Sequence, residues 1–355
     1  MDNIQLEFTA KVNVEKVLAF LAKHDVKITQ KTKGKRTDKN ILFVRDVGPH
    51  KSGWMFTIYP NSDRITCSGG PSTTFFGFNA WVSLAESLQM KAIVSILRDK
   101  LNKVDGVDVA ADSLVTVSRV EITHLYQFAS LDEIIQAEQA IYRNLVARYP
   151  GKVSLVGESL EVPGTLRVGL TKSTTLLRVY PELDKFKRLP AGVLQEKWQQ
   201  LREHLQYCLR VETIMDKGDL VKAGLSDAAA WSSRQDVLHM VNQRMTEAGL
   251  RVAVRQDSAQ LDLLLAKEAT NAVKQVIEAW KAGKATKGTG TWSRAQELVK
   301  SCGYDMTIPY SAHDRLEHGF LDRFSADRVY ELPLELRQDP ELFRRWWEEQ
   351  ELVSD

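Results

Sequence analysis

Two segments of the sequence place an arginine and a glutamate two residues apart within a run of β-forming residues. They are Ser118-Arg119-Val120-Glu121-Ile122-Thr123 and Leu209-Arg210-Val211-Glu212-Thr213. Because alternate side chains of a strand share a face, each arginine should point the same way as the glutamate that follows it. Two such carboxylates, brought together, could hold a hard divalent cation through oxygen ligands. The alternative is a structural arginine–glutamate ladder between neighbouring strands.

A third segment, Leu176-Leu177-Arg178-Val179-Tyr180, ends in a tyrosine and is followed by the cations Lys185 and Lys187. A tyrosine at a strand end could act as a nucleophile toward phosphate. Nearby lysine or arginine side chains would then stabilise the phenolate and the charge that develops on the phosphate. A lone tyrosine near a lysine is more often a packing residue, and this is the alternative.

Positive charge is concentrated in two places. Residues 27–39 hold six cations against the single acid Asp38, and we expect this run to lack regular structure. Its cations are Lys27, Lys31, Lys33, Lys35, Arg36 and Lys39. A second group, around a Gly-rich hinge or loop, flanks Trp292 and consists of Lys281, Lys284, Lys287 and Arg294. Both groups could bind the phosphates of nucleic acid; the alternative is that they are solvated basic loops.

Several function classes are excluded by missing motifs. The sequence has no phosphate-binding Gly-x-x-x-x-Gly-Lys-Ser/Thr loop, no Gly-x-Ser-x-Gly elbow, and no Cys-x-x-Cys or His-x-x-x-His pair. Its three cysteines lie far apart, which favours a reducing cytosol. We expect neither a signal peptide at the polar N-terminus nor a membrane span, because no window approaches 18 apolar residues. With 48 basic and 46 acidic residues, total charge does not decide for or against nucleic acid.

Apolar periodicity predicts an α+β fold, with an antiparallel-rich sheet and packed helices. We expect strands at residues 4–12, 41–44, 54–59, 64–67, 115–125, 165–170, 175–180 and 207–215. We expect helices at residues 14–24, 80–104, 131–149 and 191–205, with Asn13 and Ser130 as N-caps.

The pattern changes near Ala223, after which most segments predict helices: residues 228–241, 257–267, 272–281, 293–301 and 340–351. We therefore expect an α+β domain at residues 1–222 and a mainly helical domain at residues 223–355. The second domain would serve DNA binding or oligomerisation.

Taken in order, these segments resemble the replication initiators of filamentous single-stranded DNA phages, of the gene II, phage X and CRI type. Residues 53–59 resemble the family's early hairpin, and residues 117–123 its Ser/Thr-Arg-Ile-Asp-x-Thr strand. Residues 177–180 resemble the segment that ends in the DNA-nicking tyrosine, and residues 209–212 the later Arg-x-Glu strand. Residues 220–225 and 292–305 also match, so the resemblance covers most of the chain.

The sequence departs from the family pattern at three positions. Phe78 stands where many members carry histidine, and Glu121 replaces the usual aspartate. Glu182 occupies the position two residues after the tyrosine, where many members carry lysine; Lys185 or Lys187 is the nearest substitute. The His-hydrophobe-His metal motif of many rolling-circle initiators is absent.

The resemblance implies a rolling-circle replication initiator whose sheet domain is a nuclease core. This origin-nicking and strand-rejoining endonuclease would act through a covalent bond between Tyr180 and DNA, with Lys185 favouring the phenolate. Mg²⁺ or Mn²⁺ would be held by Glu121 and Glu212. Residues expected to orient these carboxylates or to contact DNA are Arg119, Arg210, Lys31, Lys33, Lys35, Arg36, Lys187 and Arg294.

The partners implied are single- and double-stranded DNA at an origin and host replication proteins, in the cytoplasm of a host bacterium. The alternative function belongs to another class, a non-catalytic DNA-binding regulator of a phage or mobile element. The histidine missing at Phe78 favours the regulator, whereas Tyr180 and the two Arg-x-Glu strands favour the enzyme.

Overall fold

A computed structural model describes residues 1–32, 39–47, 52–59, 62–76, 86–148, 153–156, 165–171, 174–183, 195–232, 234–247, 258–284, 290–301, 304, 306, 310, 324 and 328–337. Its strands are β1 (Asn3–Thr9), β2 (Lys11–Val12), β3 (Ile28–Thr32), β4 (Lys39–Val47), β5 (Ser52–Tyr59), β6 (Arg64–Gly69), β7 (Val107–Asp108), β8 (Val115–Gln127), β9 (Val153–Val156), β10 (Thr165–Thr171), β11 (Thr174–Pro181) and β12 (Cys208–Asp216). Its helices are α1 (Val14–Lys23), α2 (Pro71–Phe76), α3 (Glu86–Asn102), α4 (Leu131–Arg148), α5 (Gln195–Leu205), α6 (Lys217–Lys222), the 3₁₀ helix η2 (Ala228–Ala230), α7 (Arg234–Glu247), α8 (Ser258–Glu268), α9 (Asn271–Lys281), α10 (Gly290–Ser301) and α13 (Leu334–Arg337).

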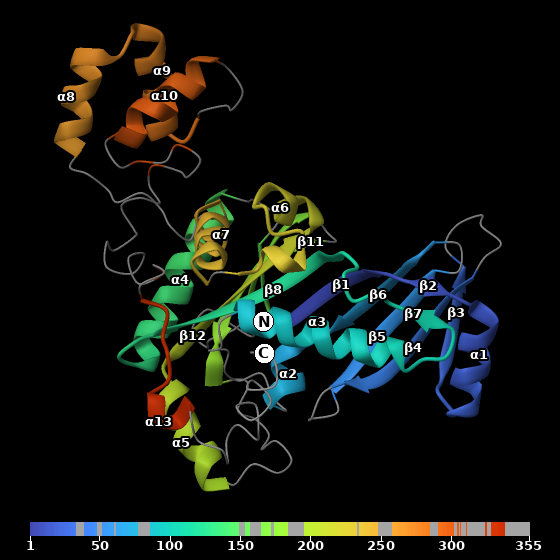
Figure 1. The fold of residues 1–355 in the computed structure, drawn as a ribbon. Helices are drawn as coiled ribbons and strands as arrows, with labels where there is room; N and C mark the ends of the chain where they lie inside the picture. Colours follow the sequence, from blue (N-terminus) through green and yellow to red (C-terminus); the bar gives the residue numbers. More distant parts are fainter. Residues whose placement is uncertain are drawn as a thin grey trace.

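Ten of these strands form one sheet in the order β3-β4-β5-β6-β1-β8-β12-β11-β10-β9, and all neighbours in it are antiparallel (Figure 1). The predicted α+β class with a large antiparallel sheet is therefore confirmed. In antiparallel neighbours, directly opposite residues share a face of the sheet, so the register decides which side chains meet.

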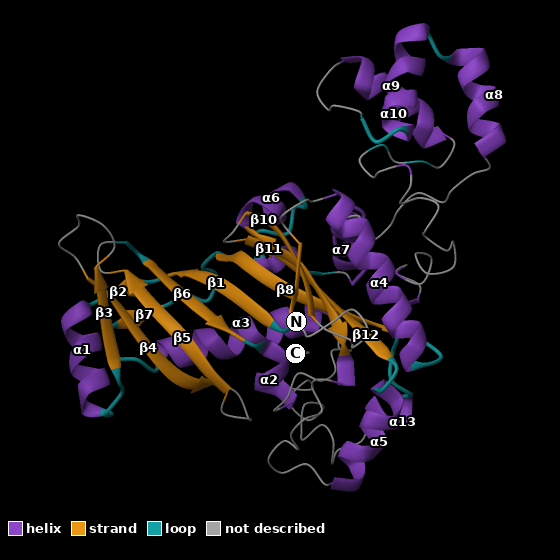
Figure 2. Ribbon diagram, turned by 180° about the vertical axis from the view of Figure 1, so that it is seen from behind, coloured by secondary structure: helices purple, strands orange, loops and turns teal. Residues whose placement is uncertain are grey.

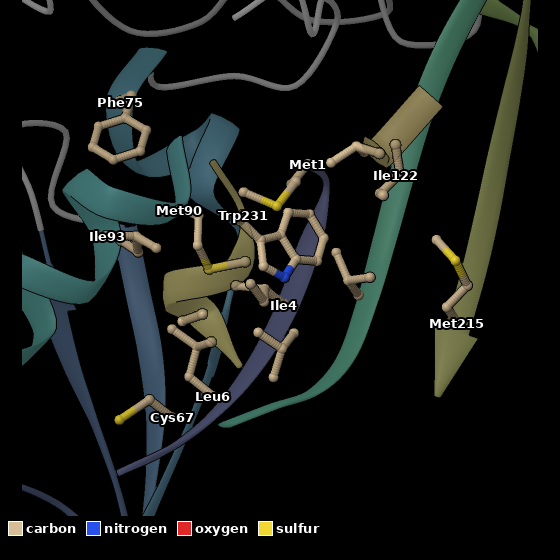
Figure 3. Close-up of a cluster of buried hydrophobic side chains, with 14 of the residues drawn as sticks. Met1, Ile4, Leu6, Cys67, Phe75, Met90, Ile93, Ile122, Met215 and Trp231 are labelled. Atoms are coloured by element: carbon tan, nitrogen blue, oxygen red, sulfur yellow. The ribbon is translucent and has the colours of Figure 1, made fainter. Parts of the chain in front are cut away.

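One face of the sheet carries the main hydrophobic core. Strand β1 buries every second side chain, Ile4, Leu6 and Phe8, as its alternating sequence requires. Helices α2 and α3 pack over this face, and Trp231, which follows η2, lies among Met1, Ile4 and Met90 (Figure 3). Segments far apart in the chain thus close the core on the same side of the sheet.

The opposite face of the β3–β8 half of the sheet is turned to solvent. Figure 2 views the molecule from this side, with α3 behind the strands. Residues on this face include the exposed Asn3, Thr9, Met55 and Arg64, which alternate with buried core residues along their strands. We call this surface the open face.

Helix ends follow the local sequence as predicted. The Asn13 side chain accepts a hydrogen bond from the Lys16 backbone N–H at 3.1 Å and caps α1. The Ser130 hydroxyl accepts one from the Glu133 N–H at 3.3 Å at the start of α4. Both caps satisfy amide groups that the first helical turn leaves without a partner.

Two local predictions are corrected by the structure. The run expected to lack structure contains β3, because Ile28 pairs in register with Phe43 and its neighbours complete an edge strand. The single helix expected at residues 228–241 is instead η2 followed by α7. The break lies at Trp231, whose indole N–H donates to the Leu225 carbonyl at 2.9 Å and anchors the chain in the core.

The described elements after β12 are helices, and they pack in two groups. Helix α7 joins the core of the sheet through Val237, Val241 and Met245. Helices α8, α9 and α10 form a second core, centred on Ile277 and Trp280, apart from the sheet in Figure 1. The predicted domain boundary near residue 223 stays a prediction. Among the described helices, none combines the length and the apolar character needed to cross a membrane.

Gly106 allows a testable comparison with Gly224, because both have positive φ, +88° and +71°. A Cβ on Gly106 would lie 2.7 Å from the Asn13 carbonyl oxygen, whereas one on Gly224 would meet nothing within 4 Å. We expect Gly224→Ala to lower the free energy of unfolding by about 1 kcal/mol from backbone strain alone. Gly106→Ala should cost at least twice as much in urea denaturation. Equal losses would show that α1 shifts freely away from the glycine.

Candidate functional site

The sheet order brings the three segments singled out in the sequence onto adjacent strands. Strand β12 lies between β8 and β11, so the two Arg-x-Glu strands are neighbours and the tyrosine strand flanks them. Glu212 lies opposite Thr123 on one side and opposite Arg178 on the other. Tyr180 lies opposite Arg210. The polar side chains of all three strands therefore point to one face.

Arg178 links the two glutamates. Its guanidinium contacts Glu212 Oε2 at 3.0 Å and Glu121 Oε1 at 3.5 Å. Arg119 contacts the same Glu121 oxygen at 3.2 Å. The shared polar cluster expected from the two Arg-x-Glu strands is present, and it includes ion pairs of the ladder type named as the alternative.

Arg210 forms the buried centre of the cluster. Its Nη1 lies 3.0 and 3.1 Å from the two oxygens of Glu182, its Nε lies 3.1 Å from Glu212 Oε1, and its Nη2 contacts Asp2. Burial alone would lower the pKa of the guanidinium, but Asp2 and Glu182 raise it well above its ordinary value. Arg210 is fully buried, so in this structure it orients carboxylates and presents no surface to a phosphate.

Tyr180 is buried and donates its hydroxyl hydrogen to Glu212 Oε1. Burial raises its pKa far above the usual value, and the charges of Glu212 and Asp2 add to this, while Arg210 opposes it. The phenol is therefore protonated at neutral pH, and the group placed to accept its proton is Glu212. The expected assistance from Lys185 stays a prediction, since Lys185 and Lys187 lie outside the described residues.

The pKa values of Glu212 and Asp2 shift in opposite directions. Burial raises the pKa of Glu212, and the neighbouring Asp2 raises it further, with Arg210 acting in the opposite direction. Burial would also raise the pKa of Asp2, but the Arg210 guanidinium, the hydrogen bond with Glu212 and the N-terminal amine together outweigh it, and the pKa of Asp2 lies below its ordinary value. Of this pair, Glu212 is thus the stronger proton acceptor.

Asp2 and Glu182 are site residues that the sequence reasoning did not assign. Asp2 precedes β1, and its backbone N–H donates to the Glu121 carbonyl at 2.9 Å, which places it beside β8. No motif surrounds Asp2 in the sequence. In the sequence, Glu182 is distinguished only by its departure from a family pattern, yet both of its carboxylate oxygens contact Arg210.

Solvent reaches the cluster from one side. The exposed fraction of the side chain falls from 39% for Arg119 and 30% for Arg178 to 8% for Glu121, 2% for Glu212 and 0% for Arg210. A ligand would therefore approach at Arg119 and Arg178, with the glutamates behind them.

The donor set suits a cation. Among the described residues, no three Asp, Glu, His or Cys side chains converge as the ligands of a metal ion would. Glu121 and Glu212 nevertheless hold a positive guanidinium group between them. Two carboxylates that share one positive group are the oxygen ligands that Mg²⁺ and Mn²⁺ prefer, so these residues fit a divalent cation.

The open face continues from this edge of the cluster. Thr116 and Arg119 of β8 share it with Glu7 and Gln5 of β1, and the face runs on across β6 and β5. Glu7 contacts Arg64 at 3.4 Å and Lys217 at 3.6 Å. The exposed groups of this surface include Arg64, Lys217, Arg119, Met55 and Val44, with Tyr59 stacked 4.7 Å below the Arg64 guanidinium.

The remaining predicted DNA contacts are not brought together with the cluster. Lys31 lies on β3, at the far edge of the sheet, and Arg294 is exposed on α10 in the separate helical group (Figure 1). Lys33, Lys35 and Arg36 lie outside the described residues.

Arg210 should be essential for stability. Arg210→Met would leave Asp2 and Glu182 buried without their cation, and we expect it to lower the free energy of unfolding by about 3 to 5 kcal/mol. The matched control is Arg64→Met, which breaks a half-exposed ion pair with Glu7 and should cost less than about 1 kcal/mol. Urea denaturation of both variants decides the matter; similar losses would mean that the buried charges rearrange.

Comparison with known proteins does not assign the chain to a family. Neither a scan against protein-family models nor a search of curated proteins found a match for the chain. The likeness to filamentous-phage initiators therefore rests on the ordered motifs of the sequence.

Proposed function

We propose that this protein is a rolling-circle replication initiator, a tyrosine-dependent DNA endonuclease and strand transferase with Tyr180 as its nucleophile. The observation that carries the proposal is the hydrogen bond from the Tyr180 hydroxyl to Glu212, inside a cluster whose carboxylates also hold a cationic group. A nucleophile, a proton acceptor and a cation site thus share three adjacent strands, as the tyrosine mechanism requires.

The reaction follows from these positions. Tyr180 transfers its proton to Glu212, and its oxygen attacks a phosphodiester of the DNA. The bond from phosphorus to the 3′ oxygen breaks, which leaves a tyrosyl–DNA bond at phosphorus and a 3′ oxygen that takes up a proton. The new ester conserves the free energy of the broken one, so the later rejoining step needs no ATP. The resulting 3′-hydroxyl is the primer for host polymerase.

Burial opposes loss of the Tyr180 proton, and two neighbouring groups act in favour of it. The raised pKa of Glu212 increases its affinity for the proton that the phenol must lose. Arg210 lowers the cost of the phenolate by its charge, with its guanidinium carbon 6.0 Å from the centre of the tyrosine ring. A divalent cation held by Glu121 and Glu212 would supply Lewis-acid polarisation of the scissile phosphate when bound.

The open face offers a path for a single strand of DNA. Arg119, Arg64 and Lys217 place three cations on the face, where the acids include Glu7 and the exposed Asp46 of β4. Tyr59 and Met55 add flat and apolar surface of the kind on which bases stack. In this proposal the strand crosses β5, β6 and β1 and presents its phosphate at Arg119 and Arg178.

Further parts of the proposal come from the resemblance. The helical region at residues 223–355 would contribute DNA binding or oligomerisation. Host replication proteins would be its partners in the bacterial cytoplasm. The second candidate function is a non-catalytic DNA-binding regulator on the same scaffold. It is favoured by the burial of Tyr180 and by carboxylates that arginines already neutralise.

Removal of one hydroxyl separates the two functions. With Mg²⁺ and a randomised pool of labelled single-stranded oligonucleotides, the parent should form protein–DNA adducts that survive denaturation. Tyr180→Phe should form none, while its melting temperature and DNA affinity stay close to the parent's. Tyr126→Phe is the matched control, because its buried hydroxyl contacts Met245 on the other face of the sheet. Adducts formed by Tyr180→Phe at the parental rate would exclude Tyr180 as the nucleophile.

The proposed DNA path makes a separate prediction about salt. Each phosphate contact with single-stranded DNA adds about 0.7 to the slope of log affinity against log salt concentration. The double substitution of Arg64 and Lys217 by Gln should therefore lower that slope by roughly 1.4. The control is the same substitution of the exposed Lys91 and Lys103, at α3 on the core side of the sheet. If both double variants change the slope equally, the strand does not follow the open face.

A further inference from the structure

Arg178 occupies the space between the two glutamates expected to bind metal. It stands opposite Glu212 in the β11–β12 register and reaches past it to Glu121 on β8. Its two terminal nitrogens contact different carboxylates, Nη1 the one on β12 and Nη2 the one on β8. Among the described residues, Arg178 is the cation whose ion pairs connect Glu121 with Glu212.

The need for this bridge follows from charge. Glu121 and Glu212 are both buried and lie on the same face of adjacent strands, so their mutual repulsion must be compensated. Arg178 supplies a positive charge at the point that both carboxylates reach. A divalent cation bound to the same oxygens would be repelled at close range by the Arg178 guanidinium, so the metal ion and the guanidinium cannot occupy the site together.

We propose that the Arg178 guanidinium is a built-in cation that holds the metal site of this protein until a divalent ion displaces it. This inference rests on the proposed function and deepens it. On displacement, the Arg178 side chain turns outward, where it can contact a phosphate of the DNA strand on the open face. Metal binding and phosphate binding then assist each other, because each stabilises the outward position of the same side chain.

The position of Arg178 allows this movement. Its side chain is 30% exposed at the solvent edge of the cluster, whereas that of Arg210 is 0% exposed and held by three carboxylates. An arginine at the edge can exchange a carboxylate for a phosphate, since its planar group binds either with two parallel hydrogen bonds. Arg210 has no such route and stays as the fixed cation of the cluster.

The test is Mn²⁺ binding to the full chain without DNA, measured from the electron spin resonance signal of free Mn²⁺. Arg178→Gln should bind Mn²⁺ about tenfold more tightly than the parent, because the ion no longer displaces a unit charge from its ligands. The matched control is Arg167→Gln. Arg167 is exposed on β10 directly opposite Arg178, and it forms no ion pair with either glutamate within the described residues. The affinity of Arg167→Gln for Mn²⁺ should stay within about twofold of the parent's if only the bridging charge of Arg178 matters.

An unchanged or weaker affinity in Arg178→Gln would overturn the proposal, as would equal tightening in Arg167→Gln. If Arg178→Gln is too unstable to titrate, the Mn²⁺-dependent rise of its melting temperature is compared with that of Arg178→Lys. A larger rise for Gln supports displacement, and an equal or smaller rise contradicts it.

A second arm uses a short single-stranded oligonucleotide. The DNA should tighten Mn²⁺ binding by the parent and have a clearly smaller effect on Arg178→Gln, in which no guanidinium links the two ligands. Equal tightening in both would contradict the coupling. These outcomes are distinct from failure of the proposed function: tighter Mn²⁺ binding in Arg178→Gln without adducts in the parent would refute the nuclease and leave the metal exchange standing. Adducts without any tightening would do the reverse.

Discussion

The buried guanidinium of Arg210 is the interaction on which the rest of the site depends. Arg210 has no exposed surface and is held by Asp2, Glu182 and Glu212, which come from three separate parts of the chain. None of these carboxylates could stay charged at this depth without it, and Arg210 could not be buried without them. The strands β11 and β12 and the segment before β1 are thereby fixed to one another, which also fixes the position of Tyr180.

The exposure of the side chains increases from the buried interior of the cluster to its edge. At the interior, burial and neighbouring carboxylates raise the pKa values of both Tyr180 and Glu212, and the Arg210 guanidinium opposes both shifts. At the edge, Arg178 and Arg119 are partly exposed and hold Glu121 and Glu212 from the solvent side. In the function we propose, these ion pairs at the edge would open to admit a metal ion and a phosphate.

The edge of the cluster adjoins the open face of the large sheet. Helices and Trp231 close the core on one face, and the other face of the β3–β8 half remains open and continuous with Arg119. A long polymer can lie on such a face, whereas a closed pocket would admit only a small ligand. Helices α8, α9 and α10 have a core of their own and contribute no residue to the cluster among those described.

The sequence by itself determined the strands that form the candidate site and the faces on which their side chains lie. Arg119, Glu121, Arg210, Glu212 and Tyr180 were identifiable because a strand alternates with a period of two and its signal is local. The tertiary structure decided what those residues contact. Asp2 meets Arg210 across 208 positions of the chain, and Arg178 bridges two glutamates only because β12 lies between β8 and β11. Strand order, register and burial arise from long-range pairing, for which a single sequence holds no local signal, so the buried state of Tyr180 and the bridging role of Arg178 emerged only from the folded chain.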